Sequence, residues 1–171
     1  MPSGKTHDFF NILVLIVGIA VVFSYNLLAD QMDEDVLKNC LYLFLGSYIF
    51  STFMLSPDLD LHKNRSKLNW GFLRFIWYPY SKIFSHRGIS HSLIFGILTR
   101  LVYIYFFYFL GLLAYWYYSD IDFEDLRFLF VEAPGDFEIA YGITFLAGIY
   151  FPSILHSILD WFVSSVKKSK K

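Results

Sequence analysis

The sequence predicts an all-α integral membrane protein: a four-helix bundle with an interfacial or re-entrant aromatic helix between its second and third spans. Of 171 residues, 56% are hydrophobic and only 17% are charged, whereas about 25% of the residues in a soluble domain are charged. Four stretches also reach the roughly 20 apolar residues that a membrane-spanning helix needs. Since a soluble core could not bury so much apolar surface, we expect a single membrane domain over residues 1–171.

The spans are expected at residues 9–29, 36–55, 92–118 and 139–163. The first resembles a signal peptide because Lys5 precedes it, but no small-residue cleavage site follows. The second has Lys38 at its entrance, where a long side chain can reach the interface. The third contains Arg100, and the fourth contains His156 and Asp160. Ionisable groups inside a membrane are costly, which makes these three side chains functional candidates.

The aromatic segment between the second and third spans reads "LNWGFLRFIWYPYSKIF", residues 68–84. Trp and Tyr gather at membrane–water interfaces, so the segment predicts an interfacial or re-entrant helix that covers the functional site. An ordinary membrane-surface helix is the alternative.

The charged connections predict the orientation. The connection after the second span is basic ("HKNRSK"), as is the tail "KKSKK", whereas the other two connections are acidic. Because basic loops stay on the cytoplasmic side, both termini and the middle connection are expected there.

The histidines and nearby acids gather on this predicted cytoplasmic side. All five histidines lie near the cytoplasmic span ends: His7, His62, His86, His91 and His156. The acids expected on that side are Asp8, Asp58, Asp60 and Asp160, each within four residues of a histidine. In "HSILD", His156 and Asp160 share one helix face. Imidazole and carboxylate groups together bind zinc, manganese, iron or nickel, so a metal site is predicted.

The candidate ligands are more numerous than one ion needs. They are His7, Asp58, Asp60, His86, His91, His156 and Asp160. This number suggests two divalent ions, or one ion with carboxylates that orient the histidines; zinc is expected, with manganese, iron or nickel as alternatives. An extended chain would point Asp58, Asp60 and His62 the same way. A helix capped by Ser56 would instead place Asp58 and His62 on one face.

Three candidates have simpler alternatives. His62 lies beside the basic run and could be solvated, and Asp8 could stabilise the start of the first span through the helix dipole. Arg100 could pair with Asp160.

The segment "SHRGISHS", residues 85–92, supplies further groups. Ser90 is expected to cap the third span, which places His91 in the first helical turn. Arg87 is an expected contact of an anionic substrate, because a helix N-terminus aided by an arginine favours anions. Arg100, which lies deeper in the same span, is also expected to neutralise the substrate anion.

The chain resembles a known family in "SPDLDL", "WG" at 70–71, "WYPY" at 77–80, "HRGISHS", Arg100 and the late histidine. These features are similar to those of prokaryotic membrane proteins described as metal-binding and related to predicted membrane-bound metal-dependent hydrolases. The likeness covers nearly the whole chain and implies an inner-membrane location. It also implies a hydrolase-type metal centre carried by Asp58, Asp60, His86, His91, His156 and Asp160, with His7 near the start. Phosphatidic-acid phosphatases are matched only in "HSILD", since Tyr150 replaces their arginine.

We therefore expect a metal-dependent hydrolase of a lipid or other amphiphilic phosphoester at the cytoplasmic face. Asp60, or Asp58, would serve as the general base. Membrane lipids are the expected partners, and nucleic acid is not. A metal-ion transporter or sensor, and a scaffold whose metal ties helix ends together, are the alternatives. The charge-poor outer halves of the spans argue against transport.

Overall fold

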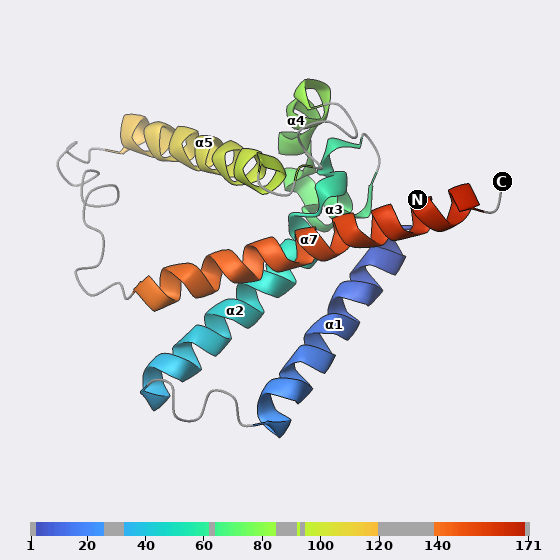
Figure 1. Cartoon of the computed structure of the whole chain (residues 1–171). Coiled ribbons are helices and arrows are strands. Elements are labelled where there is room, and N and C mark those ends of the chain that lie inside the picture. Colours follow the sequence, from blue (N-terminus) through green and yellow to red (C-terminus); the bar gives the residue numbers. More distant parts are fainter. Residues whose placement is uncertain are drawn as a thin grey trace.

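The computed structural model describes residues 3–25, 33–61, 64–84, 92, 95–119 and 139–169. Within these ranges all regular structure is helical, which confirms the all-α class. Four of the described helices are long and apolar enough to cross a membrane (Figure 1). They are α1 (Gly4–Ser24), α2 (Glu34–Met54), α5 (Phe95–Tyr118) and α7 (Ile139–Ser169).

The helix bounds differ from the predicted spans where polar residues extend a helix. α1 begins at Gly4, because the Ser3 side chain accepts a hydrogen bond from the backbone N–H of Thr6. His7 therefore lies inside α1 and not before it. α7 continues to Ser169, with basic residues in its last turn, where they complement the helix dipole.

The described part of α5 lies within the predicted third span. α5 begins at Phe95, whose backbone N–H donates to the Ser92 hydroxyl at 3.4 Å. The predicted cap Ser90 lies outside the described residues.

α2 and α7 pack closely through small residues. A Cβ added to Gly148 on α7 would lie 1.9 Å from the Ser47 Oγ on α2. One turn further along α2, Ser51 donates its hydroxyl hydrogen to the carbonyl of Ile149 at 2.6 Å. Small side chains and such interhelical hydrogen bonds hold membrane helices together, because lipid provides no hydrophobic force between them.

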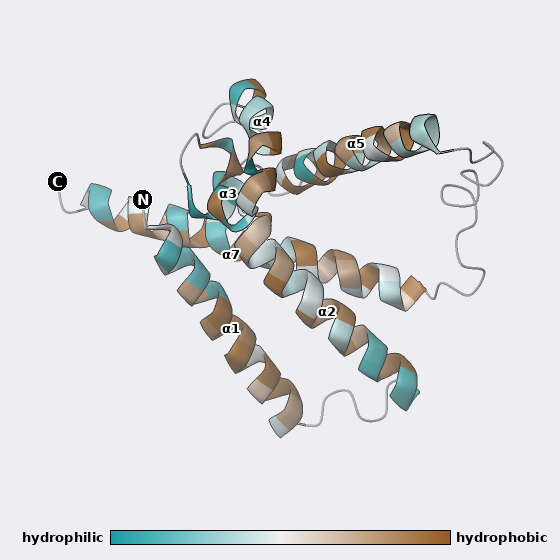
Figure 2. Cartoon of the chain, turned by 180° about the vertical axis from the view of Figure 1, so that it is seen from behind, coloured by the Kyte–Doolittle hydropathy of each residue, from teal (hydrophilic) through white to brown (hydrophobic). Residues whose placement is uncertain are grey.

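α1 joins this pair through a narrow stripe. Its buried residues are His7, Asn11 and Leu15, which are four positions apart and so share one face. The Asn11 side chain donates to the carbonyl of Pro152 at 3.3 Å, and the Tyr48 hydroxyl donates to the Asn11 carbonyl at 2.9 Å. Many other apolar side chains of the long helices are exposed, and hydrophobic residues run along these helices (Figure 2).

Short helices connect α2 to the region before α5. They are η1 (Pro57–Asp60), α3 (Arg65–Asn69), η2 (Gly71–Ile76) and α4 (Trp77–Ile83). The Ser56 hydroxyl caps η1 and Pro57 takes its first position, which confirms the predicted cap; the pairing of Asp58 with His62 lies outside the described residues. Gly71 has a φ of 56°, in the left-handed region, which explains a glycine after Trp70 in "WG". The interfacial or re-entrant placement of these helices stays a prediction.

The hydrophobic core lies at the end of the bundle that carries the short helices. Trp77 and Tyr80 of α4 are fully buried. They pack in one cluster with Leu55, Ile97 and Ile149, which come from the C-cap of α2, from α5 and from α7. The core therefore holds the long helices together where the candidate ligands lie.

Candidate metal centre

The start of α1, the η1 turn and the second half of α7 meet at one end of the bundle, which we call the site end (Figure 1). His7 comes from α1, Asp58 from η1, and His156 and Asp160 from successive turns of α7. The side chains of Ser51 and Asn11 donate hydrogen bonds to α7, at the carbonyls of Ile149 and Pro152. Both acceptors lie just before His156 in the sequence. The packing that joins α1, α2 and α7 therefore also aligns these ligands.

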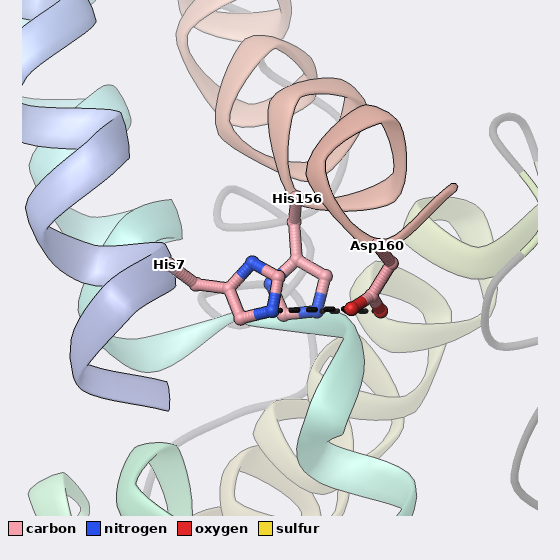
Figure 3. A group of neighbouring side chains, drawn as sticks. All are labelled: His7, His156 and Asp160. Carbon is pink, nitrogen blue, oxygen red and sulfur yellow. Dashed lines mark ion pairs between the residues drawn. The ribbon is translucent and has the colours of Figure 1, made fainter. Parts of the chain in front are cut away.

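The Asp160 carboxylate lies at the edge of two stacked imidazoles and is close to both of them (Figure 3). Its Oδ1 is 3.3 Å from the His7 Nε2, and its Oδ2 is 3.7 Å from the His156 Nε2. The His156 Nε2 is also 3.6 Å from the Asp58 Oδ1. The two imidazole rings are stacked, with centroids 3.6 Å apart and planes at 11°. Two nitrogens and two carboxylates thus meet in one small volume.

These separations suit a bound cation. Ligand atoms of His7, His156 and Asp160 all lie within 4.8 Å of one another. Zinc bonds of about 2.0–2.2 Å in a tetrahedron place neighbouring donors roughly 3.3–3.6 Å apart, close to the observed values. Within the described part of the chain, both Asp160 oxygens are buried without a hydrogen-bond partner. Such groups are costly unless a cation compensates them, so the residues fit a metal.

Asp60 occupies a different environment from Asp58. Its side chain is buried and interacts electrostatically with Lys67 and Arg100. Burial lowers the pKa of the Lys67 ammonium, and the nearby Asp60 carboxylate opposes that shift. Lys67 also lies over the ring of Tyr78, at 5.6 Å from its centroid. The structure therefore brings Asp58 to the histidines and Asp60 to two buried cations.

Arg100 is buried and bonds within α5, to the C-cap of α2 and to α7. Its Nε donates to the carbonyl of Gly96 at 2.7 Å, its Nη1 donates to the carbonyl of Leu55, and its Nη2 donates to the Ser153 hydroxyl at 3.5 Å. Asp160, the alternative partner expected from the sequence, is not among its hydrogen-bond partners in the described ranges. Substrate binding by Arg100 stays a prediction.

Asp8 pairs with a cation and does not serve the helix dipole. No acidic residue lies in the first turn of α1, where the dipole acts. Instead, the Asp8 Oδ2 lies 3.2 Å from the Arg65 Nη1 on α3.

Several predicted residues lie outside the described ranges: His62, His86, Arg87 and His91. Their roles stay predictions. In turn, sequence reasoning missed three residues near the ligands, namely Lys5, Asn11 and Arg65. Asn11 could have been found as a polar side chain four residues after His7 in an apolar helix, since such groups are costly in a membrane.

A cavity of about 500 Å³ opens beside the ligands. His7, Asp58 and Asp160 line it, together with Lys5, Arg65 and Leu68. The centre thus has an accessible side.

Comparisons with known proteins agree with a metal site. A family model described as "Uncharacterized metal-binding protein (DUF2227)" matches residues 2–170. A protein of Aquifex aeolicus (strain VF5), described as an uncharacterized protein, is 46% identical over 57 residues, which are 33% of this chain and 40% of the relative. The chain thus spans less than half of that relative's length. No solved structure matches the chain. Because the family model covers nearly the whole sequence, the chain belongs to this family of metal-binding proteins.

Proposed function

We propose that the protein is a membrane-embedded metal-dependent hydrolase that acts on a lipid or other amphiphilic phosphoester at the cytoplasmic face. The observation that carries the proposal is the cavity of about 500 Å³ lined by His7, Asp58 and Asp160. Structural zinc sites are closed by protein ligands, whereas catalytic sites keep an open position. A ligand cluster that faces accessible space therefore favours chemistry.

The described residues divide the work as follows. His7, His156 and Asp160 would hold the divalent ion, with zinc expected, and Asp58 lies beside them. A bound divalent ion supplies a Lewis acid for the phosphoryl oxygen and an activated water. Asp58 lines the cavity, so it is better placed than the buried Asp60 to accept the proton of the attacking water. Asp60 would then hold the cations around it in position.

The residues beyond the described ranges complete the proposal. His86 and His91 are proposed as ligands of the first or of a second ion. Arg87 and Arg100 are proposed to neutralise the substrate anion. The basic connections and tail support a cytoplasmic site.

An activity assay on the purified full chain tests this function. The zinc-loaded protein in detergent should release phosphate from dihexanoyl phosphatidic acid. Asp58→Asn should lower kcat by about 100-fold or more, as expected for loss of a general base. Asp60→Asn should have a smaller effect, and Asp35→Asn at the exposed start of α2 is the matched control. Hydrolysis that survives the combined loss of His86 and Asp160 would refute the mechanism.

A structural metal is the second candidate, and one observation favours it. Among the described residues, α1 buries only His7, Asn11 and Leu15, so a metal on His7 would add much to its docking. In that case chelation should release α1 from α7, while no phosphoester is hydrolysed. Spin labels on α1 and α7 would measure the separation directly.

A further inference from the structure

The cavity has two kinds of wall besides the ligands. Lys5 of α1 and Arg65 of α3 supply cations, and Leu61 and Leu68 supply apolar surface. Leu68 is 63% exposed, so the apolar side of the cavity continues to the protein surface. One cavity therefore combines the candidate metal ligands, positive charge and an apolar path outward.

The charged side chains among the described lining residues leave this cavity positive once a divalent ion is bound. Asp58 and Asp160 balance such an ion, and Asp8 balances Arg65 through their 3.2 Å ion pair. Lys5 then remains uncompensated, since no ion pair of Lys5 occurs within the described ranges. A guanidinium has five N–H donors, so Arg65 can hold Asp8 and still face the cavity.

The start of α1 adds to this positive character. Ser3 and Gly4 line the same cavity, and a Cβ added to Gly4 would lie 3.7 Å from that of Arg65. A helix N-terminus favours anions through its N–H groups and its dipole. His7, which is only 3% exposed, also lines the cavity, and its Nδ1 has no hydrogen-bond partner among the described residues.

We infer that this cavity binds the phosphate monoester head group of a lipid between the metal ligands and the Lys5–Arg65 pair, with the acyl chain along Leu61 and Leu68. A volume of about 500 Å³ is in the range of small-ligand sites. The inference rests on the proposed function for the choice of ligand, and it deepens that function by naming the head group and the residues that select it. It needs metal and anion binding, but not turnover.

Calorimetric binding to the full chain in detergent tests the inference. The protein is loaded with zinc, free zinc is removed, and two probes that cannot be hydrolysed are titrated: inorganic phosphate and the phosphonate analogue of dihexanoyl phosphatidic acid. Lys5→Ala should weaken both probes by about tenfold, the effect of losing one charged hydrogen bond. Leu68→Ser should weaken only the lipid, also by about tenfold, because it removes apolar contact. The lipid should bind more tightly than phosphate to the wild type.

Controls separate this subsite from general electrostatics and from misfolding. Lys167→Ala removes an exposed cation from the last turn of α7, which is outside the cavity lining, and should leave both affinities unchanged. For a variant at position 65, Arg65→Lys is preferred to Arg65→Ala, because lysine keeps a cation that can pair with Asp8. The zinc content of every variant should equal that of the wild type, because none of these residues is a proposed ligand.

Two results would overturn the inference. Equal phosphate affinities for Lys5→Ala and Lys167→Ala would remove the anion subsite. Equal lipid affinities for Leu68→Ser and the wild type would remove the acyl path and leave free phosphate as the ligand. If the predicted binding pattern is found but no phosphoester is hydrolysed, the proposed function fails while the subsite stands.

Discussion

Asp160→Asn is the sharpest test of the metal centre, because one carboxylate contacts both stacked histidines. The change keeps the shape of the side chain but removes the charge that lies 3.3 Å from the His7 Nε2 and 3.7 Å from the His156 Nε2. Loss of a residue that merely orients a ligand typically costs 10–100-fold in metal affinity. Loss of a shared ligand should therefore cost at least about 100-fold, which corresponds to about 2.7 kcal/mol.

The assay has two readouts on protein purified in detergent. Elemental analysis should find stoichiometric zinc in the wild type and little in Asp160→Asn. Zinc should also raise the thermal midpoint of the wild type. A ligand at 100 times its Kd stabilises by about 2.7 kcal/mol, which is roughly 5–10 °C for a chain of this size. The variant should lose that increase.

A matched control makes the result interpretable. Asp35→Asn makes the same chemical change at an exposed position in the first turn of α2, away from the site end. It should keep the zinc content and the thermal increase. If Asp160→Asn binds zinc with wild-type stoichiometry and affinity, the reasoning that places a metal between these side chains is refuted.

Three further outcomes are expected. In thermal unfolding, Gly148→Ala should destabilise the protein by about 1–3 kcal/mol, because its Cβ would lie 1.9 Å from the Ser47 Oγ. The control Gly111→Ala, which has open space around it, should be neutral or stabilising in the same experiment. Arg100→Met should lower the free energy of unfolding by about 2–4 kcal/mol, since it leaves buried carbonyls without donors. An unchanged free energy of unfolding together with lost activity would instead indicate a substrate role for Arg100. Zinc affinity should fall on acidification, because protons compete with the metal for the imidazole nitrogens. A zinc affinity that stays constant down to the pH at which the protein itself unfolds would contradict histidine ligation.

The long helices and part of the site could be predicted because their signals are local. A span depends on the hydropathy of about 20 consecutive residues, and the four long apolar helices are confirmed. The pairing of His156 with Asp160 follows from helical spacing alone. His7 is a candidate ligand because the predicted topology places it at the same end of the bundle as His156 and Asp160.

The rest depends on contacts that the sequence does not show. Asp58 and Asp60 are two positions apart, and the sequence alone does not distinguish their roles. The capped η1 turn directs the Asp58 carboxylate toward His156 and places Asp60 near Lys67. Arg100 bonds mainly to backbone carbonyls, which every residue carries, so its partners have no sequence signature. Arg65 reaches the cavity because α3 packs beside the start of α1.

The narrow buried stripe of α1 would link metal occupancy to the lipid environment. One proposed ligand, His7, lies on a helix that buries only Asn11 and Leu15 besides it in the described structure. Apolar contact gives little advantage to helix association in a bilayer, since lipid tails compete equally. Metal binding and docking of α1 are therefore thermodynamically linked, and each stabilises the other. A change in the bilayer that favours a detached α1 would lower the affinity for the ion without touching any ligand.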